Sequence, residues 1–106
     1  MPKKEIFCAA EKTLKVIDGR WKLLILRELF VGPKRFGVLR DSLNGITEKM
    51  LIQQLRELKK QGIILRKDFK RLPPKVEYSI SPFGKTLISV IKAMNDWGLK
   101  YGKRVK

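Results

Sequence analysis

The sequence predicts a mainly α-helical domain that carries one small β-hairpin, the winged helix-turn-helix type of fold. A short helical segment at 36–42 and a longer one at 47–61 flank an Asn44-Gly45 turn, which is the sequence form of a helix-turn-helix. Two short β-type segments follow, joined by a basic stretch that suits the tip of a projecting hairpin. A long amphipathic segment then ends the chain.

Two helices are expected ahead of this unit. The first is predicted over Ala9–Asp18, where apolar residues recur at helical spacing before a glycine. The second, Arg20–Val31, is apolar nearly all around its circumference, which is typical of a buried helix. We therefore expect it to be the central core helix, ended by Gly32-Pro33.

The helix-turn-helix itself has clear boundaries. Lys34–Phe36 is predicted as a very short strand, and Phe36–Ser42 as a short helix. Thr47 is predicted to be the N-cap of a longer helix that runs to Gln61, with Gly62 in the C′ position.

The next segments predict a wing and a last helix. Ile63–Phe69 and Val76–Ile80 are expected to pair as strands. Leu72-Pro73-Pro74 lies between them and is too stiff and poor in donors for a sheet interior, so it marks the hairpin tip. Ser81-Pro82 supplies a cap and a first-turn proline for a helix over Phe83–Tyr101.

Composition favours a polyanionic partner. The 106 residues correspond to about one domain, predicted over 1–106 with a dimerisation helix at about 83–101. Lysine and arginine number 25 against 10 acidic residues, a net charge of +15. Repulsion among so many like charges disfavours a compact chain. The excess of basic residues therefore indicates a polyanionic binding partner, which is nucleic acid or, less often, an acidic membrane surface.

The residues that are missing exclude several classes of protein. Histidine is absent and Cys8 is the single cysteine, which argues against zinc sites, disulfides within the chain and an activated nucleophile. We therefore expect no enzyme activity, no catalytic residue, no metal and no cofactor. The apolar runs are too short to cross a bilayer and the first residues lack a signal-peptide core, so a cytoplasmic protein without membrane contact is expected.

The helix over 47–61 has two unlike faces. Leu51, Leu55 and Leu58 form one stripe, which must pack on the core, and cations and amides lie opposite. Arginine and lysine can donate to guanine, and glutamine can pair with adenine, in the major groove of double-stranded DNA. A solvated helix face is the alternative. The expected DNA-binding residues of this recognition helix are Thr47, Lys49, Gln53, Gln54, Arg56 and Lys60.

Further cations are expected to contact the DNA backbone or the minor groove. They lie on the hairpin and just before the short helix, where a solvated basic loop or turn is the alternative. These residues are Lys34, Arg35, Arg66, Lys70, Arg71 and Lys75.

The last helix carries an apolar stripe about four turns long, larger than a minimal winged helix needs for its own core. We expect it to form a homodimer interface, although packing within the chain is the alternative. The residues of the stripe are Leu87, Val90, Ile91, Met94, Trp97 and Tyr101.

The sequence resembles the HxlR family, prokaryotic winged-helix transcriptional regulators related to the MarR group. The matching segments, in order along the chain, are Cys8, GRWKLLILREL at 19–29, GPKRFGVL at 32–39, GITEKML at 45–51 with two further leucines, and PPKVEYSI at 73–80 with Gly84. The resemblance implies a homodimer that binds an inverted-repeat operator with its recognition helices and wings. Ala9, where the family often has proline after the cysteine, and Glu48, at another position where it often has proline, depart from the pattern.

Cys8 is a candidate sensor of oxidants or electrophiles. We expect it just before the first helix, where unpaired backbone N–H groups favour a thiolate. The resemblance implies such a role, since an equivalent cysteine serves some family members as a sensor. The alternative is a small buried hydrophobic residue.

The expected function is therefore a sequence-specific DNA-binding regulator, repressing or activating, with an unknown effector. A winged-helix module that binds protein or RNA is the alternative. An apolar outward helix face would favour a protein partner, and exposed aromatic residues would favour RNA. The outward face is basic, and Phe69 is the single aromatic of the wing.

Overall fold

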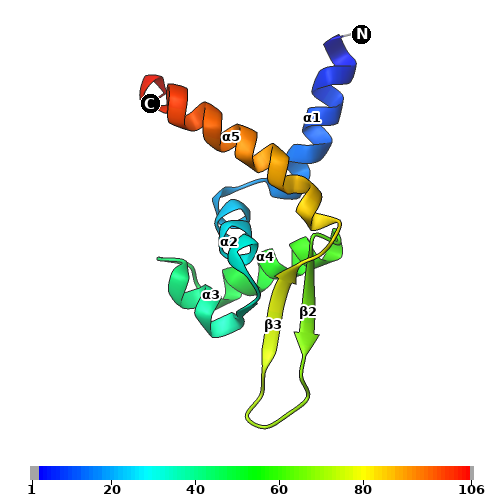
Figure 1. Cartoon of the computed structure of the whole chain (residues 1–106), viewed down its shortest axis with the longest axis vertical. Helices are drawn as coiled ribbons and strands as arrows, with labels where there is room; N and C mark the ends of the chain where they lie inside the picture. The colour runs from blue at the N-terminus through cyan, green and yellow to red at the C-terminus, as the bar shows by residue number, and fades with distance from the viewer. Residues whose placement is uncertain (1–2, 106) are drawn as a thin grey trace.

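The computed structural model describes residues 3–105, with side chains from Cys8 onward. It is mainly helical, with one small three-stranded sheet (Figure 1). The elements are α1 (Lys3–Ile17), α2 (Arg20–Val31), β1 (Lys34–Arg35), α3 (Phe36–Ser42), α4 (Glu48–Lys60), β2 (Ile64–Asp68), β3 (Val76–Ile80), the 3₁₀ helix η1 (Gly84–Leu87), α5 (Ile88–Tyr101) and the 3₁₀ helix η2 (Gly102–Arg104).

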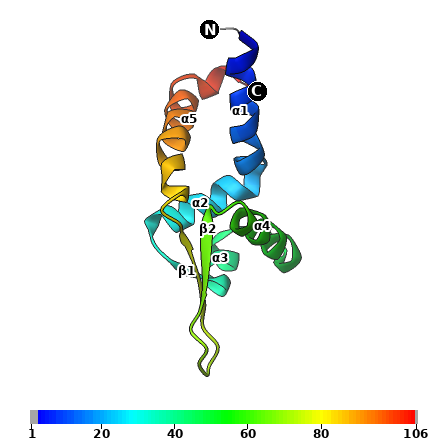
Figure 2. The same ribbon diagram turned by 90° about the vertical axis from the view of Figure 1, so that its right-hand side faces the viewer.

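The three strands form an antiparallel sheet in the order β1-β3-β2. Tyr78 of β3 lies opposite Lys34 on one side and Arg66 on the other. The β2–β3 hairpin extends well beyond the helices and forms the wing (Figures 1 and 2). The predicted winged helix-turn-helix fold is confirmed.

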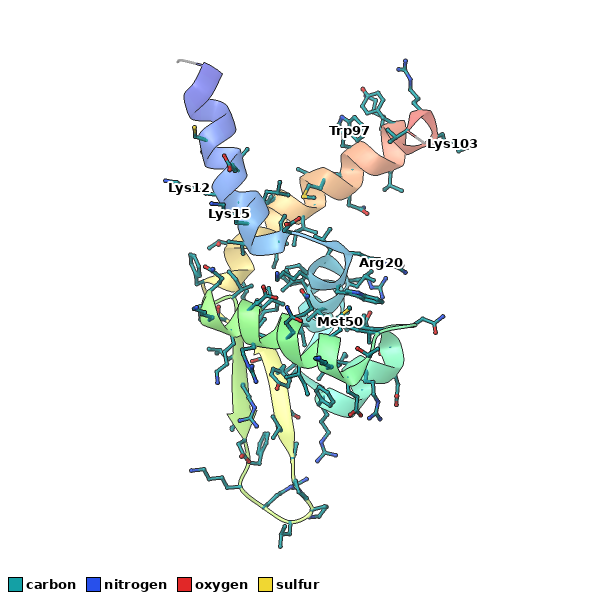
Figure 3. The ribbon with its side chains drawn as sticks, turned by 180° about the vertical axis from the view of Figure 1, so that it is seen from behind. Lys12, Lys15, Arg20, Met50, Trp97 and Lys103 are labelled. Atoms are coloured by element: carbon teal, nitrogen blue, oxygen red, sulfur yellow. The ribbon has the colours of Figure 1, made fainter. Side chains whose placement is uncertain are left out.

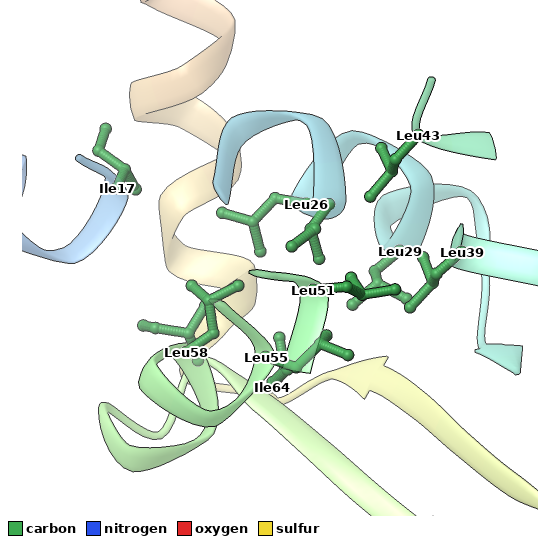
Figure 4. Packing of buried hydrophobic residues seen from close by; sticks show 11 residues of the cluster. Ile17, Leu26, Leu29, Leu39, Leu43, Leu51, Leu55, Leu58 and Ile64 are labelled. Atoms are coloured by element: carbon green, nitrogen blue, oxygen red, sulfur yellow. The ribbon is translucent and has the colours of Figure 1, made fainter. Parts of the chain in front are cut away.

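The core surrounds α2, as its nearly uniform apolar composition predicts. Ile25 and Leu26 are fully buried, and leucines of α3 and α4 close around them (Figure 4). The buried cluster is Ile17, Ile25, Leu26, Leu29, Leu39, Leu43, Leu51, Leu55, Leu58, Ile63 and Ile64. The predicted leucine stripe of α4 is therefore its inward face.

The helix-turn-helix follows its sequence signals closely. The α3 helix has the predicted bounds. Thr47 caps α4, because its side-chain oxygen accepts a hydrogen bond from the backbone N–H of Met50 at 3.1 Å. Gly62 has a φ of +75°, the left-handed conformation expected at C′.

Several predicted boundaries differ from the structure. The first helix begins at Lys3 rather than Ala9, because residues 3–8 contain no helix breaker that would delay its start. It ends at Ile17, one residue before the predicted Asp18. The strand predicted over Ile63–Phe69 is one residue shorter at each end, because its pairing with β3 extends only from Ile64 to Asp68. The strand β1 ends at Arg35, since Phe36 already begins α3. The long last helix does not begin at Phe83, because a separate 3₁₀ turn precedes α5.

The Ser81 junction, by which we mean Ser81 and Gly84 packed on the backbone of Gly62 and Ile63, explains that separate turn. The Ser81 hydroxyl lies 2.5 Å from the carbonyl oxygen of Gly62 and 3.0 Å from that of Ile63, and accepts a hydrogen bond from the Gly84 N–H at 2.8 Å. The Ser81 N–H also donates to the Ile63 carbonyl at 3.0 Å. Ser81 thus acts as the predicted cap while it binds the turn that follows α4.

The α1 and α5 helices extend from the body on the side opposite the wing (Figures 1 and 2), and they diverge from each other in the view of Figure 1. No residue of α5 is buried. No helix within residues 3–105 is both long and apolar enough to span a membrane.

The Ser81 junction predicts that Gly84→Ala destabilises the protein. A Cβ at this position would lie 2.1 Å from the Ile63 carbonyl oxygen, so the backbone must shift. We expect a loss of about 2 to 3 kcal/mol in the free energy of unfolding, measured by urea denaturation. Gly37→Ala is the control, because its Cβ would meet the nearest atom at an ordinary 3.7 Å. Equal effects of the two substitutions would contradict the assignment.

Candidate nucleic-acid interface

The outward face of α4 is basic and accessible. Because Leu51, Leu55 and Leu58 are at most 2 % exposed, the opposite side of the helix must face solvent. The predicted contact residues Thr47, Lys49, Gln53, Arg56 and Lys60 are all exposed there, whereas Gln54 is half-buried at the edge.

The structure adds residues to this face that sequence reasoning missed. Ile52 is 46 % exposed, and together with Arg56 and Lys59 it lines a cleft of about 330 Å³ between α4 and the sheet. Arg66 of β2 and Tyr78 of β3 form the other wall. Lys59 could have been predicted as a contact residue, because it lies next to Lys60 in sequence. The cleft could not have been predicted, because it depends on the register of the sheet and no local sequence pattern indicates it.

The wing extends past α4 on the side where that helix crosses the sheet (Figure 3). The Asp68 carboxylate accepts a hydrogen bond from the Lys70 N–H at 2.8 Å, and this holds Lys70 at its positive φ of 48°. The predicted wing cations Arg66, Lys70 and Arg71 are exposed.

Phe69 organises the loop at the tip of the wing, a role that the sequence did not indicate. Its ring centroid lies 4.7 Å from the Lys67 ammonium and 4.2 Å from that of Lys75. The Phe69 N–H donates to the Lys75 carbonyl at 2.9 Å. Lys75 is half-buried and forms an ion pair with Glu77 at 3.6 Å, so this predicted contact residue already has partners.

The two cations ahead of α3 lie in the sheet. Lys34 is half-buried beside Tyr78, and Arg35 is exposed beside Glu77. They belong to β1, the strand that pairs with the wing strand β3, so they approach the hairpin from the side opposite β2.

Both carboxylates of α4 have cationic partners on other helices. Arg40 of α3 donates from Nη1 to Glu48 at 2.7 Å and from Nε to Asp41 at 3.3 Å. The hydrogen bond to Glu48, followed by that to Asp41, raises the pKa of the Arg40 guanidinium above its usual value. Lys22 of α2 lies 3.6 Å from Glu57.

Within the described residues, no ion pair involves Lys49, Arg56, Lys59 or Lys60. Four cations and the Gln53 amide are therefore available on one helix face. The same part of the chain contains no cluster of acidic or cysteine ligands that could hold a metal ion.

The predicted apolar stripe of the last helix is divided between two roles. Leu87 and Ile91 are half-buried and pack against the core. Val90, Met94 and Trp97 are 36 to 57 % exposed. The Trp97 ring lies 5.3 Å from that of Tyr101, which is half-buried, near the free end of α5 (Figure 3).

A second apolar surface of α5 was not predicted. Ile88 and Leu99 are 45 and 78 % exposed. They face Leu23, Leu24 and Phe30 of α2 across a groove of about 830 Å³. The sequence analysis followed only the stripe and missed this surface, because Ile88 and Leu99 lie on the adjacent face of the same helix.

Cys8 is not where the sequence placed it. It lies within α1 rather than ahead of the first helix, so the amide groups of the helix start do not surround it. Its side chain is exposed, which also makes the buried alternative wrong.

Residues 16–106 match the family described as HxlR-like helix-turn-helix. The HTH-type transcriptional regulator YdeP of Bacillus subtilis (strain 168) is 49 % identical over 98 residues, which cover 92 % of this chain and 77 % of that protein.

Solved structures of similar proteins share the fold. The redox regulator HypR in its reduced form matches with a TM-score of 0.84 and 42 % identity, over 88 % of this chain and 92 % of that one. HypR has also been solved in its oxidised form. A MarR-family transcriptional regulator from Enterococcus faecalis V583 has a TM-score of 0.85 and 36 % identity, over 98 % of this chain and 92 % of that one. YdeP and the Enterococcus faecalis protein are described as regulators of transcription, and HypR is described as a redox regulator.

Proposed function

The chain belongs to the HxlR-like helix-turn-helix family, and we propose that this transcriptional regulator binds double-stranded DNA as a homodimer on an inverted-repeat operator. One observation carries the proposal. The exposed face of α4 presents cations without ion-pair partners within the described residues, directly beside a projecting basic wing.

In this proposal α4 enters the major groove, which is wide enough to admit a helix. Lys49 and Arg56 donate to guanine or phosphate, and Gln53 pairs with adenine. Thr47, Gln54 and Lys60 complete the contact surface of the helix.

The wing and the adjoining strand supply the backbone contacts. Arg66, Lys70 and Arg71 bind phosphates or the minor groove, and Lys34, Arg35 and Lys75 add positive charge beside them. Such contacts position the protein on the duplex without reading its sequence.

The first expected result is DNA binding dominated by phosphate contacts. The logarithm of the affinity falls with the logarithm of the salt concentration, with a slope near −0.9 for each phosphate neutralised. Arg71→Ala weakens binding to operator and random DNA alike. Gln53→Ala makes the free energy of binding to the operator less favourable by about 1 to 3 kcal/mol and weakens the preference for one base at the base pair that Gln53 contacts.

Fluorescence anisotropy on operator fragments selected from genomic DNA, and on scrambled duplexes, measures these quantities. An affinity that does not change with salt, or equal losses on both duplexes from both substitutions, argues against the assignment. Tighter binding to single-stranded RNA supports the RNA-binding alternative instead.

We also propose that residues 1–106 act as one domain that dimerises through its terminal helices, chiefly the segment at about 83–101. An exposed apolar surface on α5 supports this proposal, because its contact with water is unfavourable. The surface consists of Val90, Met94 and Trp97, with Tyr101 beside them. Leu87 and Ile91 contribute only their uncovered parts. A two-fold axis through this surface pairs two α4 helices with half-sites about one DNA turn apart or a multiple of it.

The second expected result is a dimer in sedimentation at tens of micromolar. Trp97→Arg places a charge in the centre of the apolar surface and weakens association by about 2 to 4 kcal/mol. Val31→Arg is the control, because Val31 is 81 % exposed at the end of α2 and outside both terminal helices. If the wild-type protein is a monomer at this concentration, the two-fold axis is absent and an inverted-repeat operator is no longer expected.

We further propose that Cys8 responds to oxidants or electrophiles. The proposal rests on the exposure of the thiol and on the likeness to a protein described as a redox regulator, not on the helix dipole. In a dimer, two such thiols can join across chains.

The third expected result is that diamide changes DNA affinity in the wild type but not in Cys8→Ser. Non-reducing electrophoresis follows any disulfide between chains, and thiol titration shows that Cys8 is accessible. A wild type that loses its titratable thiol yet keeps its DNA affinity excludes a sensing role.

A further inference from the structure

Each of the two carboxylates on α4 is paired with a cation from an earlier helix. Glu48 pairs with Arg40 of α3, and Glu57 pairs with Lys22 of α2. The rest of the exposed face is neutral or basic. The arrangement differs between the pairs, because Arg40 is an exposed surface residue whereas Lys22 is not.

Lys22 is a buried cation. The residue is 8 % exposed, and it lies on the core helix α2 among Ile25, Leu26 and Leu29. The Lys22 side chain is only 11 % exposed, so it is much less accessible to a DNA phosphate than the cations on the outward face of α4. A buried charge needs a partner, and Glu57 is the one carboxylate within ion-pair distance among the described residues.

Glu57 has a competing partner on its own helix. Lys60 follows it by three residues, the spacing at which oppositely charged side chains pair on a helix surface. Within the part of the chain described, no Glu57–Lys60 ion pair is present, and the carboxylate approaches Lys22 at 3.6 Å instead. Glu48 has no such competitor, since the residues three and four positions after it are Leu51 and Ile52.

We propose that Lys22 is a positioning residue for DNA binding, which holds Glu57 against α2 and so leaves Lys60 of α4 available to a DNA phosphate. The inference rests on the proposed DNA binding and extends it to a residue that touches no DNA. Without Lys22, Glu57 pairs with Lys60 and withdraws one cation from each recognition helix.

Salt dependence of DNA affinity tests this directly. Lys22→Met reduces the steepness of the log–log salt plot by about 0.9 for each protomer, the value for one lost phosphate contact. The affinity at about 0.1 M salt falls about five- to tenfold for each lost contact. Adding Lys60→Met to Lys22→Met produces little further change, although Lys60→Met alone in the wild type produces the full loss.

Rescue separates positioning from folding. The double variant Lys22→Met with Glu57→Gln restores the wild-type slope, because the competing carboxylate is gone. Lys85→Met is the matched control, since it removes the same charge from an exposed position on η1 and is expected to leave the slope unchanged. Thermal unfolding of every variant runs in parallel.

Three outcomes overturn the inference. They are an unchanged slope in folded Lys22→Met, a reduced slope that Glu57→Gln does not restore, and a Lys60→Met variant with the wild-type slope. The last needs no change at Lys22 and therefore decides the matter even if Lys22→Met does not fold. A wild type that shows no salt-dependent DNA affinity instead refutes the proposed function itself.

Discussion

The Ser81 junction fixes the relative positions of the parts of this molecule that the proposed function uses. The end of α4, the start of the wing and the start of the α5 segment meet where Ser81 and Gly84 bind the backbone of Gly62 and Ile63. The hydroxyl can satisfy this site only because it both donates and accepts. Since Gly84 lies against the Ile63 carbonyl with no room for a Cβ, the junction also sets the direction in which the last helix leaves the body.

The fold therefore separates two surfaces of opposite chemistry. Leu51, Leu55 and Leu58 hold α4 with its cations outward, next to the wing. The exposed apolar residues of α5 lie at the other end of the molecule (Figure 1). A partner molecule on the apolar end does not compete with a ligand on the basic end. The Ser81 junction links α4 and the wing to the segment that leads into α5, so the geometry of any dimer affects the spacing of its two basic faces.

The sequence predicts the structure correctly where the local pattern of residues and the packing of the whole domain favour the same arrangement. Thr47, Gly62 and the leucine stripe each specify a single arrangement, and the structure has it. The prediction failed where contacts between residues far apart in the sequence determine the structure. The break before α5 depends on Ile63, 21 residues before Gly84, and the cleft beside Ile52 depends on strand pairing. The early start of α1 was missed because the sequence before Lys3 contains no serine, threonine, aspartate or asparagine to indicate a cap.

The acidic residues of the body show how so basic a chain remains folded. Between Arg20 and Ser81 there are six carboxylates, and every one accepts a hydrogen bond or forms an ion pair: Glu28, Asp41, Glu48, Glu57, Asp68 and Glu77. The acids are thus engaged in internal structure, and most of the cations that they leave unpaired within this body lie on α4 and the wing. Repulsion among those cations destabilises the free protein, and phosphates that bind them relieve it. If the protein binds DNA as proposed, DNA binding and the stability of the fold are therefore coupled through the same side chains.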